Sequence, residues 1–554
     1  MTAPMTAPLL EVADLRVAFG DTEVVHGVSL TVTPGECVAI VGESGSGKSV
    51  TARALLGMAG RGSRAESSVL RIGGREFGGA GERVWRDIRG REVGLILQDA
   101  LVSLDPLRPI GREIDDPLRI HERMSRPERR ARVHDLLAAA GMPDPDFAAR
   151  RRSGELSGGL RQRALIAAAI ALDPPLLIAD EPTTALDATV QARILELIAE
   201  IRTRGTGVLL ISHDLAVVGR LADRILVMRA GEVVESGTAA EVLGSPREPY
   251  TRRLIAAVPS DVARGVRLTR SEPSPPTAAE PPATTTPRAR VPNATHELPL
   301  LTLDHVSKTF AVPGGRFTAV DDVTLEVRRG ETLGLVGESG SGKTTVARLA
   351  LALTAPDTGE VTLDGAPWSR LDERARRPMR RRIGAIYQDA LSSFDPRWNV
   401  EHILADAMGV GAPGHHSRTA DHGVAGLLEQ VGLETSVARR RPLTLSGGQR
   451  QRVAIARALA ASPEILICDE PVSALDVTIQ AQILDLLDDV QRDRGLALLF
   501  ISHDLGVVRH MADRVAVMQA GRIVETGPAD AVFAEPEHPY TARLVADAPR
   551  LSRT

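Results

Sequence analysis

Short apolar runs mark the buried elements of this 554-residue chain. Residues 36–41 and 331–336 each open on a glutamate, continue with mainly apolar residues, and lead directly into a glycine-rich stretch. Apolar runs of this length, bounded by turn residues, are typical of strands buried on both faces. The residues that follow the glycines, 50–56 and 345–353, predict helices. A strand, a glycine-rich loop and a helix are therefore expected twice.

Two further apolar runs end in a pair of acids. Leu176 to Asp180 is followed by Glu181, and Ile465 to Asp469 is followed by Glu470. Ligands of open α/β sheets bind beyond the carboxyl ends of the strands. We therefore expect these carboxylates at the sheet edge where the glycine-rich loops also begin.

The glycine-rich stretches have the spacing of a phosphate-binding loop. Gly42-Glu-Ser-Gly-Ser-Gly-Lys-Ser49 and Gly337-Glu-Ser-Gly-Ser-Gly-Lys-Thr344 both match G-x-x-x-x-G-K-[ST], in which backbone N–H groups and the lysine hold phosphates and the hydroxyl holds Mg²⁺. Lys48 and Lys343 are two of only three lysines among 67 Lys and Arg residues, so these positions require a compact ammonium. The residues expected to bind nucleoside triphosphate are Gly42, Ser44, Gly45, Gly47, Lys48, Ser49 and Val50 in one loop, and Gly337, Ser339, Gly340, Gly342, Lys343, Thr344 and Thr345 in the other.

Composition narrows the class of protein. With 43% hydrophobic and 25% charged residues, the chain is expected to fold into about two to four globular domains. No apolar run approaches the roughly 18 residues of a membrane helix, and the N-terminus lacks a secretory pattern. A net charge of −4 gives no overall reason to bind nucleic acid. Cys37 and Cys468 lie in apolar strands, which favours core packing in a reducing cytoplasm over a disulfide or a metal site.

The chain contains an internal duplication. Matched residues recur at a spacing of 289 or 290, namely Gln98 and Gln388, Ser157 and Ser446, Asp180 and Asp469, His213 and His503, and Tyr250 and Tyr540. We expect a first domain over residues 1–258 and a second over 299–554. Residues 259–298 contain eight prolines and no aromatic residue, which predicts a disordered linker. The alternative, a small folded domain, has too little apolar periodicity for a core.

Each half carries a second set of motifs. Leu156-Ser-Gly-Gly-Leu160 and Leu445-Ser-Gly-Gly-Gln449 are similar to the signature motif of the ABC-type ATPases, and the acid pairs are similar to the second nucleotide motif of that family. The remaining matches are Gln98 and Gln388 to the Q-loop, Ala185-Leu-Asp187 and Ala474-Leu-Asp476 to the D-loop, and His213 and His503 to the switch histidine. The resemblance implies an α/β fold of two tandem P-loop ATPase domains, each a mixed-sheet core with antiparallel β and helical subdomains.

The resemblance also implies roles for these residues. Two ATP molecules would be sandwiched head to tail, each between the phosphate loop of one domain and the signature of the other. Glu181 and Glu470 would polarise the attacking water, while Gln98, Gln388, His213 and His503 orient the γ-phosphate. Mg²⁺ would be held by Ser49, Gln98 and Asp180 at the first site and by Thr344, Gln388 and Asp469 at the second. The opposing signatures would contribute Ser446, Gly448 and Gln449 to the first site, and Ser157 and Gly159 to the second. Phe19 and Phe310 are the candidates for stacking on the nucleotide base, although either residue can belong to the core.

One position departs from the family pattern. Leu160 stands where the signature usually has glutamine, as it does at Gln449. The serine hydroxyl and the glycine N–H groups remain, so we expect two hydrolytic sites with the second one modestly weakened.

The tails of the two halves favour one branch of the family. Pro246-Arg-Glu-Pro-Tyr-Thr and Pro536-Glu-His-Pro-Tyr-Thr resemble the ATPase subunits of dipeptide, oligopeptide and nickel importers, with two subunits fused here. The resemblance implies two integral-membrane permeases, an extracytoplasmic solute-binding protein, and a peripheral location on the cytoplasmic face of the membrane. The cysteine cluster that many relatives carry after this tail is missing, so no iron–sulfur site is expected. Cargo is selected by the partner proteins, so peptide, nickel, glutathione-like and sugar substrates stay open.

Two other readings remain as alternatives. An ABC exporter ATPase would carry the same motifs, and a soluble twin ATPase acting on ribosomes or nucleic acid would need a charged helical linker and a basic surface. The arginine runs at 126–132, 374–382 and 439–441 are candidates for binding phosphate or lipid headgroups, with a solvated face favoured. His415, His416 and His422 are candidates for a metal site, with an ordinary loop favoured.

Overall fold

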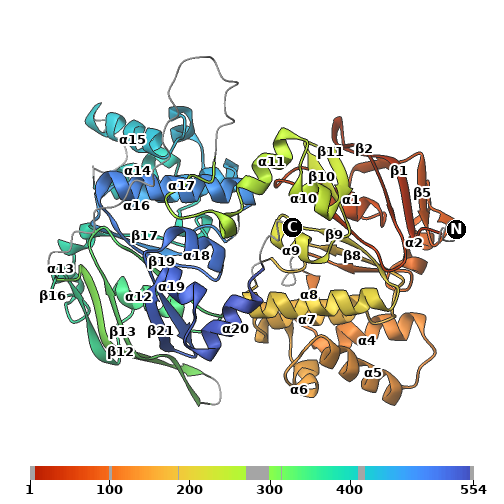
Figure 1. The fold of residues 1–554 in the computed structure, drawn as a ribbon, viewed down its shortest axis with the longest axis horizontal. Helices are drawn as coiled ribbons and strands as arrows, with labels where there is room; N and C mark the ends of the chain where they lie inside the picture. The colour runs from red at the N-terminus through yellow and green to blue at the C-terminus, as the bar shows by residue number, and fades with distance from the viewer. Residues whose placement is uncertain are drawn as a thin grey trace. The chain divides into compact units, whose positions relative to one another are not determined.

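The computed structural model describes residues 7–98, 103–184, 186–269, 298–312, 315–409, 418–473 and 475–549. Contacts divide the chain into a first unit, Met1–Ile255 with Pro549–Thr554, and a second unit, Ala256–Ala548 (Figure 1). Within the described ranges, no helix is long and apolar enough to cross a membrane. The division agrees with the duplication read from the sequence.

The segment that follows the first domain differs from the expected disordered linker. Residues 256–269 are described, and they pack within the second unit through backbone and side-chain hydrogen bonds. The division between the units therefore falls after Ile255, slightly before the boundary at residue 258 that the sequence predicts. The rest of the expected linker, residues 270–297, lies outside the described residues.

The core of the first unit is a six-stranded sheet with order β11-β10-β3-β9-β8-β7. Neighbouring strands are parallel except β10 and β11. The strands are β3 (Cys37–Val41), β7 (Val93–Ile96), β8 (Leu176–Asp180), β9 (Gly207–Ile211), β10 (Arg224–Arg229) and β11 (Glu232–Thr238). Every residue of β3, β8 and β9 is buried, as expected for apolar strands with neighbours on both sides.

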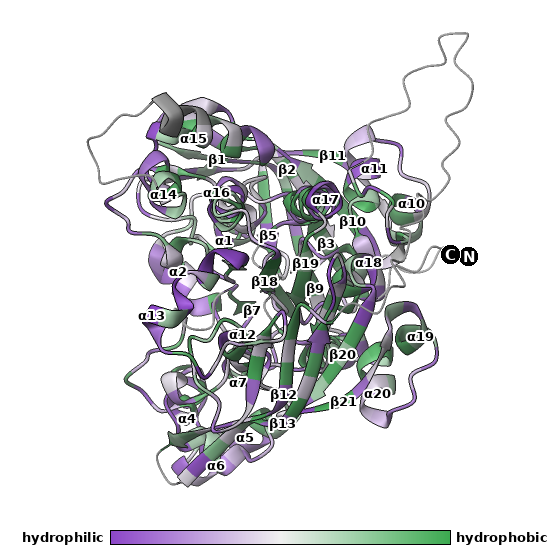
Figure 2. Cartoon of the chain, turned by 90° about the vertical axis from the view of Figure 1, so that its left-hand side faces the viewer, coloured by the Kyte–Doolittle hydropathy of each residue, from purple (hydrophilic) through white to green (hydrophobic). Residues whose placement is uncertain are grey.

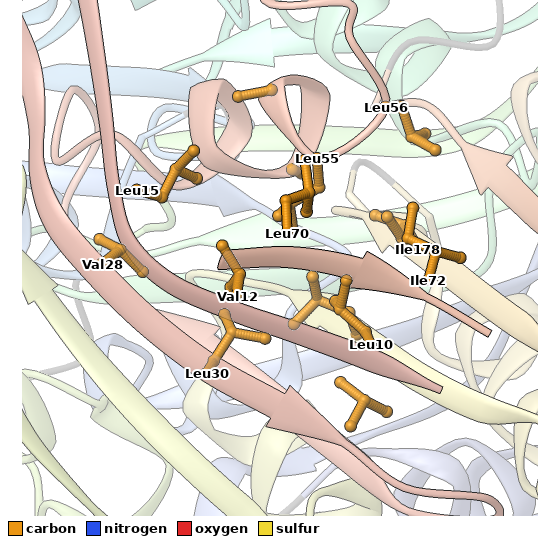
Figure 3. Packing of buried hydrophobic residues seen from close by; sticks show 14 of the residues in the cluster. Leu10, Val12, Leu15, Val28, Leu30, Leu55, Leu56, Leu70, Ile72 and Ile178 are labelled. Atoms are coloured by element: carbon orange, nitrogen blue, oxygen red, sulfur yellow. The ribbon is translucent and has the colours of Figure 1, made fainter. Parts of the chain in front are cut away.

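A second, antiparallel sheet of the first unit packs against this core. It has the order β2-β1-β5-β6, with β4 paired to β1. Its strands are β1 (Leu10–Phe19), β2 (Thr22–Val32), β4 (Ser63–Glu66), β5 (Val69–Ile72) and β6 (Arg75–Glu76). Figure 3 shows side chains of β1, β2 and β5 converging on Leu55 and Ile178 in one buried cluster. Burying these side chains fixes the antiparallel sheet to the strands that carry the site.

Helices complete the first unit. They are α1 (Lys48–Ala54), α2 (Glu82–Ile88), α4 (Ile110–His121), α5 (Arg126–Ala139), α6 (Pro145–Arg150), α7 (Gly158–Ala169), α8 (Ala188–Thr203), α9 (Leu215–Leu221), α10 (Ala239–Gly244) and α11 (Pro249–Ala256), with 3₁₀ turns at Ser153–Glu155 and, leading into the second unit, Pro259–Asp261. Helices α4, α5 and α6 pack on one another and α4 and α5 on α7, which gives the expected helical subdomain.

The second unit repeats this architecture. Its core sheet has the order β17-β18-β19-β14-β20-β21 and its antiparallel sheet the order β13-β12-β15-β16. The core strands are β14 (Thr332–Val336), β17 (Ile383–Ile386), β18 (Ile465–Asp469), β19 (Ala497–Ile501), β20 (Arg514–Gln519) and β21 (Arg522–Pro528). The antiparallel strands are β12 (Leu301–Val312), β13 (Gly315–Val327), β15 (Thr358–Leu363) and β16 (Ala366–Pro367).

The helices of the second unit correspond to those of the first. They are α12 (Lys343–Ala350), α13 (Glu373–Arg376), α14 (Val400–Ala407), α15 (Arg418–Gln430), α16 (Gly447–Leu459), α17 (Val477–Arg494), α18 (Leu505–Met511), α19 (Ala529–Ala534) and α20 (Pro539–Asp547), with 3₁₀ turns at Met379–Arg382, Leu391–Ser393, Thr435–Arg439 and Pro442–Thr444. Figure 2 shows hydrophobic residues gathered on core strands such as β18 and β19.

The helices after the glycine-rich loops begin earlier and end earlier than the sequence predicts. They start at Lys48 and Lys343 because the preceding glycines, Gly47 and Gly342, adopt left-handed conformations with φ of 100° and 110°. A left-handed residue ends the loop and lets helical geometry begin at the next position. The lysines therefore sit in the first turn of each helix.

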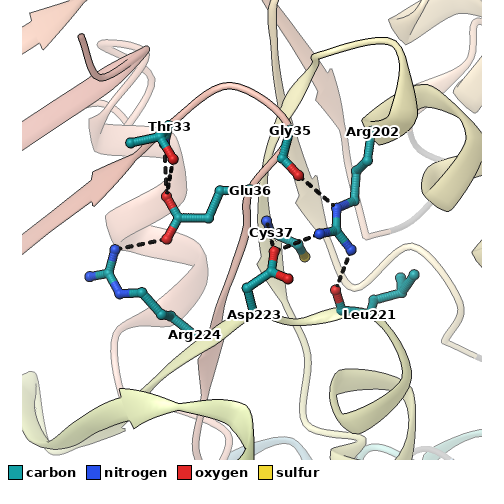
Figure 4. A network of polar contacts seen from close by, with 8 residues as sticks. All are labelled: Thr33, Gly35, Glu36, Cys37, Arg202, Leu221, Asp223 and Arg224. Carbon is teal, nitrogen blue, oxygen red and sulfur yellow. Dashed lines mark hydrogen bonds and ion pairs between the residues drawn. The ribbon is translucent and has the colours of Figure 1, made fainter. Parts of the chain in front are cut away.

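A polar network holds the start of β3, the strand that carries the first loop (Figure 4). Asp223 accepts hydrogen bonds from the Cys37 N–H over 2.7 Å and from Arg202 over 2.5 Å. Glu36 accepts from Thr33 and from Arg224. In the second unit Asp513 accepts from the Thr332 N–H over 2.8 Å in the same way. These side chains anchor each loop at its origin.

Both cysteines are core residues, as the sequence predicts. The Cys37 and Cys468 side chains are fully buried in β3 and β18 and form no disulfide. Burial raises the pKa of the Cys37 thiol to about 12, and it raises the pKa of Cys468 as well. Thiols with raised pKa values carry almost no thiolate at neutral pH and are unreactive.

Candidate functional site

Close backbone packing explains the first glycine of each loop. A Cβ atom added to Gly42 would lie 2.1 Å from the carbonyl oxygen of Met228, and one added to Gly337 would lie 2.2 Å from that of Met518. No side chain fits at these distances, so only glycine allows the loop to turn against β10 or β20. The loop tips, including Ser44 and Ser339, are exposed.

The two lysines are buried inside their loops. Lys48 Nζ donates to the carbonyl oxygens of Gly42 and Glu43 at 2.7 Å, and Lys343 Nζ donates to those of Gly337 and Glu338 at 2.8 Å. Each loop is thus curled around one ammonium group, at a helix N-terminus that also favours negative charge. This arrangement is suited to binding the outer phosphates of a nucleotide.

The hydroxyl after each lysine meets the first acid of the strand-end pair. Ser49 Oγ donates to Asp180 Oδ1 over 2.8 Å, and Thr344 Oγ1 donates to Asp469 Oδ1 over 3.4 Å. Asp180 Oδ2 is buried and accepts no hydrogen bond from the described residues. Burial raises the pKa of both aspartates. An oxygen left without a hydrogen-bond donor, next to a hydroxyl, fits the hard oxygen ligands that Mg²⁺ takes.

The second acid of each pair is held by a glutamine and a histidine, and Glu181 is held by a threonine as well. Glu181 Oε2 accepts hydrogen bonds from Gln98 Nε2 at 2.8 Å and from Thr184 Oγ1 at 2.9 Å, and His213 Nδ1 lies 3.2 Å from Oε1. In the second unit, Glu470 Oε2 accepts a hydrogen bond from Gln388 Nε2 over 2.8 Å, and His503 Nδ1 lies 3.1 Å from Glu470 Oε1. The structure therefore brings together the glutamate, glutamine and histidine that the sequence predicts for each site.

The backbone at both glutamates is unusual. Glu181 and Glu470 have φ of 50°, a left-handed conformation that costs a residue other than glycine of order 1–3 kcal/mol. Their N–H groups donate to the carbonyl oxygens of Ile211 and Ile501 at 2.9 Å. The strained turn directs the glutamate away from the buried strand and toward Gln98 or Gln388.

Electrostatics separate the two acids of each pair. Burial would raise the pKa of Glu181, but the hydrogen bond and charge of His213 lower it below the usual range. The same bond raises the pKa of His213 against the effect of its burial. Glu470 and His503 behave in the same way. Each site thus combines an aspartate with raised pKa and a glutamate with lowered pKa, a division typical of sites with different tasks for two carboxyl groups.

The signature serines lie at the starts of helices. Ser157 caps α7, where its Oγ accepts from the Leu160 N–H at 3.4 Å, and Ser446 caps α16. Gly159 and Gly448 follow in the first turn, where added Cβ atoms would lie 3.2 Å and 2.7 Å from Val190 and Ile479. No hydrogen bond among the described residues joins these serines to the phosphate loop of their own unit.

The two aromatic candidates lie on the antiparallel sheets. Phe19 ends β1 with 36% of its surface exposed, and Phe310 lies in β12 with 37% exposed. Phe310 pairs across the hairpin with the half-exposed Phe317, whereas Phe19 pairs with Thr22. Neither is a core residue, so stacking on a nucleotide base stays a prediction.

Sequence reasoning assigned no role to Tyr250 and Tyr540. The N–H of Glu43 donates to the Tyr250 hydroxyl over 3.0 Å, and the N–H of Glu338 donates to the Tyr540 hydroxyl over 3.0 Å. The tail helices α11 and α20 thus support the phosphate loops directly. The recurrence of these tyrosines at the spacing of the duplication is the signal from which a shared role could have been predicted.

Several arginines of the three arginine runs form hydrogen bonds with groups of their own unit. Arg380 and Arg376 donate to the carbonyl oxygens of Leu351 and Ala352 at 2.6 Å, beyond the end of α12. Arg382 bonds Glu464, and Arg129 bonds Asp115 over 2.7 Å. These bonds weigh against a surface dedicated to nucleic acid.

Some of the residues that the sequence singles out lie outside the part of the chain that the structure describes. Ala185 and Ala474 of the D-loop, residues 99–102 after Gln98, and the candidate metal residues His415 and His416 lie outside the described residues. His422 lies in α15, but its side chain is not described. The D-loop aspartates Asp187 and Asp476 are described, and they cap α8 and α17.

Comparison with family models identifies both repeated halves. The model described as ABC transporter matches residues 25–184 and 320–473. The model described as Oligopeptide/dipeptide transporter, C-terminal region, matches residues 234–292 and 524–554. The second model covers the tails that include Tyr250 and Tyr540.

The curated proteins that are similar to the chain over nearly its whole length include three from different transport systems. The Oligopeptide transport ATP-binding protein OppD of Mycobacterium tuberculosis is 42% identical, covering 98% of this chain and 99% of its own. The Glutathione import ATP-binding protein GsiA of Salmonella choleraesuis is 41% identical, covering 98% and 89%. The Peptidoglycan transport ATP-binding protein YejF of Agrobacterium fabrum is 42% identical, covering 98% and 97%.

Proposed function

This chain belongs to the ABC transporter family as a tandem ATPase, and we propose that it drives an importer of peptides or related small solutes by hydrolysing ATP at two sites. The observation that carries the proposal is the repeated assembly of a lysine-centred phosphate loop with a glutamate held by glutamine and histidine. The tails that match the oligopeptide/dipeptide transporter region support import over export.

In the proposed reaction, a water molecule attacks the γ-phosphate and the residues position and stabilise charge. Glu181 and Glu470 accept hydrogen bonds from the water, a task that suits carboxylates whose pKa is lowered. Lys48 and Lys343 neutralise the outer phosphate oxygens, and the histidines and glutamines orient the γ-phosphate. Phe19 and Phe310 contact the base.

We propose Mg²⁺ as the metal cofactor of both sites. Ser49, Asp180 and Gln98 would hold it at the first site, and Thr344, Asp469 and Gln388 at the second. When bound, the ion neutralises charge on the β and γ phosphate oxygens. The buried Asp180 Oδ2, which accepts no hydrogen bond from the described residues, supports this assignment.

We further propose that the two halves of one chain pair head to tail. Ser446, Gly448 and Gln449 would then complete the first site, and Ser157 and Gly159 the second. ATP would favour the closed pair because only closure brings a signature serine to the γ-phosphate, which gives the nucleotide different affinities for the two states.

The proposed partners are two integral-membrane permeases and an extracytoplasmic solute-binding protein, with this chain on the cytoplasmic face of the membrane. The test is an affinity pull-down of the Glu181→Gln, Glu470→Gln double variant from detergent-solubilised membranes in Mg-ATP, with mass spectrometry of the bound proteins. A Lys48→Ala, Lys343→Ala variant is the control that should not form the ATP-closed complex. Recovery of two multi-span permeases supports the proposal, whereas ribosomal proteins or nucleic acid without permeases would overturn it.

A further inference from the structure

Residues Ala256–Thr269 cover two helices of the second unit. Ala257, Val258 and Leu268 are buried within this segment, and Leu268 is 1% exposed. The 3₁₀ turn Pro259–Asp261 packs on α18, and the residues that follow it reach α17. We call Ala256–Thr269 the connecting segment.

The far end of the connecting segment is fixed by one buried carboxylate. Asp485 in α17 accepts hydrogen bonds from the Leu268 N–H at 3.0 Å, from the Thr269 N–H at 2.9 Å and from the Thr269 hydroxyl at 2.5 Å. Hydrogen bonds to a charged acceptor are stronger than neutral ones, and a buried carboxylate deprived of them pays a desolvation cost. Two ion pairs, Arg264 with Asp513 and Arg267 with Asp489, also tie the connecting segment to the second unit.

The near end of the connecting segment touches the first turn of α18. A Cβ atom added to Gly506 would lie 3.1 Å from Ser260 Cα, so the glycine permits a close backbone approach. One turn later, His510 Nδ1 lies 3.3 Å from the carbonyl oxygen of Val262, and the ring is buried. Both contacts hold α18 against the segment.

The first unit carries different residues at the matching positions. Gly506 corresponds to Ala216, His510 to Arg220 and Asp485 to Glu196. The side chains of Arg220 and Glu196 are 41% and 67% exposed, whereas His510 and Asp485 are 4% and 7% exposed. The glycine, the buried histidine and the short carboxylate stand at these positions in the second unit, where the connecting segment covers the two helices, and not in the first.

Helix α18 begins directly after the switch histidine of the second site. Asp504 caps α18 by accepting from the N–H groups of Gly506 and Val507, and the residue before it is His503, 3.1 Å from Glu470. A displacement of about 1 Å in a catalytic group can cost a hundredfold in rate. Movement of α18 would therefore be transmitted to His503.

We propose that the connecting segment positions His503 by clamping α18, so that hydrolysis at the second ATP site depends on chain that follows the first ATPase domain. Asp485 and Gly506 are positioning residues in this arrangement, because they act on the site through α18. The inference rests on the proposed function, in which His503 and Glu470 act on ATP at the second site.

The test compares Asp485→Ala with its matched control Glu196→Ala in the full chain. Hydrogen exchange by mass spectrometry should show the amides of Leu505–Met511 exchanging about tenfold faster in Asp485→Ala, with Leu215–Leu221 of the first unit unchanged. ATP turnover should fall by about half or more through kcat with little change in KM, since the nucleotide-binding loop is untouched. Asp485→Asn, which keeps one acceptor oxygen, should recover part of the turnover. Glu196→Ala should match the wild type in both measurements.

A second variant keeps the test valid if Asp485→Ala fails to fold. Leu268→Ala removes the buried anchor from the segment and leaves α17 and α18 unaltered, and the same changes are expected. Faster exchange of residues 256–269 with wild-type exchange in α18 and wild-type turnover would overturn the inference. Failure of the proposed function is a separate result, because it would appear as turnover insensitive to Glu470→Gln, whereas exchange in α18 does not depend on activity.

Discussion

The two ATPase units hold their reactive side chains in closely matched ways. Gln98 donates to Glu181 and Gln388 donates to Glu470 over the same 2.8 Å, and the histidine to glutamate distances are 3.2 Å and 3.1 Å. The hydroxyl to aspartate distances differ, at 2.8 Å in the first unit and 3.4 Å in the second. The contacts around the two glutamates are thus repeated more closely than the contacts between the hydroxyls and the aspartates.

The units differ more at the start of the signature helices. In α16, Ser446 Oγ accepts from the Gln449 N–H and Gln449 Oε1 accepts from the Ser446 N–H, both at 3.2 Å, which forms a capping box. In α7, Leu160 occupies the position of Gln449 and offers no acceptor. The two halves therefore share the serine and the glycines of the signature, but only α16 has the capping box that stabilises the start of its helix. Sites with matched chemistry can differ in how firmly their parts are held.

The largest effect is expected from removing the glutamates. Glu181→Gln and Glu470→Gln keep the shape of the side chain but remove the carboxylate that we propose orients water, so each should lower phosphate release, and together they should reduce it about a hundredfold or more. Steady-state phosphate release by the single and double variants is the measurement. If one single variant keeps wild-type turnover, that site is idle and the matched geometry does not mean matched activity.

The histidine–glutamate pairs should make the stability of the two units depend on pH in the same way. The pKa of His213 is raised, so its contribution to stability is complete below its ordinary value of about 6.5 and is lost as pH rises through the raised value. The pKa of Glu181 is lowered, so its contribution is present above about 4.5 and is lost as pH falls through the lowered value. The pair therefore stabilises the fold most between about pH 4.5 and 6.5.

The check is denaturant unfolding of His213→Gln and His503→Gln beside the wild type at several pH values. The stability difference should be largest near pH 6 and shrink toward about pH 9 for both variants. A difference that grows with pH in either variant would mean that the histidine is neutral in that unit and that the two pairs are not equivalent.

Most of the site could be predicted because its residues are tied to strand ends and loop spacing. Lys48, Asp180, Glu181 and His213 each follow an apolar run or a glycine pattern that sets their place at one edge of the sheet. The sequence pattern places the start of α1 two residues too late, because the left-handed conformation of Gly47 is a property of the folded loop. Such errors change the predicted ends of the helices but not the set of residues that meet at the site.

Long-range contacts could not be read from local pattern. Tyr250 accepts a hydrogen bond from Glu43 of the phosphate loop, 207 residues away in sequence. Asp485 accepts one from Leu268, 217 residues away. The proline-rich composition of residues 259–298 gives no sign that residues 259–269 pack on helices of the second unit. Within that segment, Arg264 and Arg267 form ion pairs and Leu268 is buried, and these contacts exist only in the tertiary fold.

The smallest effect is expected from exchanging the residue that distinguishes the signatures. Leu160→Gln should complete a capping box in α7 and stabilise the first unit by about 0.5–1 kcal/mol, and Gln449→Leu should destabilise the second unit by a similar amount. Denaturant unfolding of the two matched variants measures both changes. Because the Ser157 hydroxyl and the Gly159 N–H are unaffected, Leu160→Gln should change ATP turnover less than either glutamate variant does. A large gain in turnover without a gain in stability would mean instead that the glutamine contacts nucleotide directly, and that Leu160 weakens the second site by removing a ligand and not by loosening a helix.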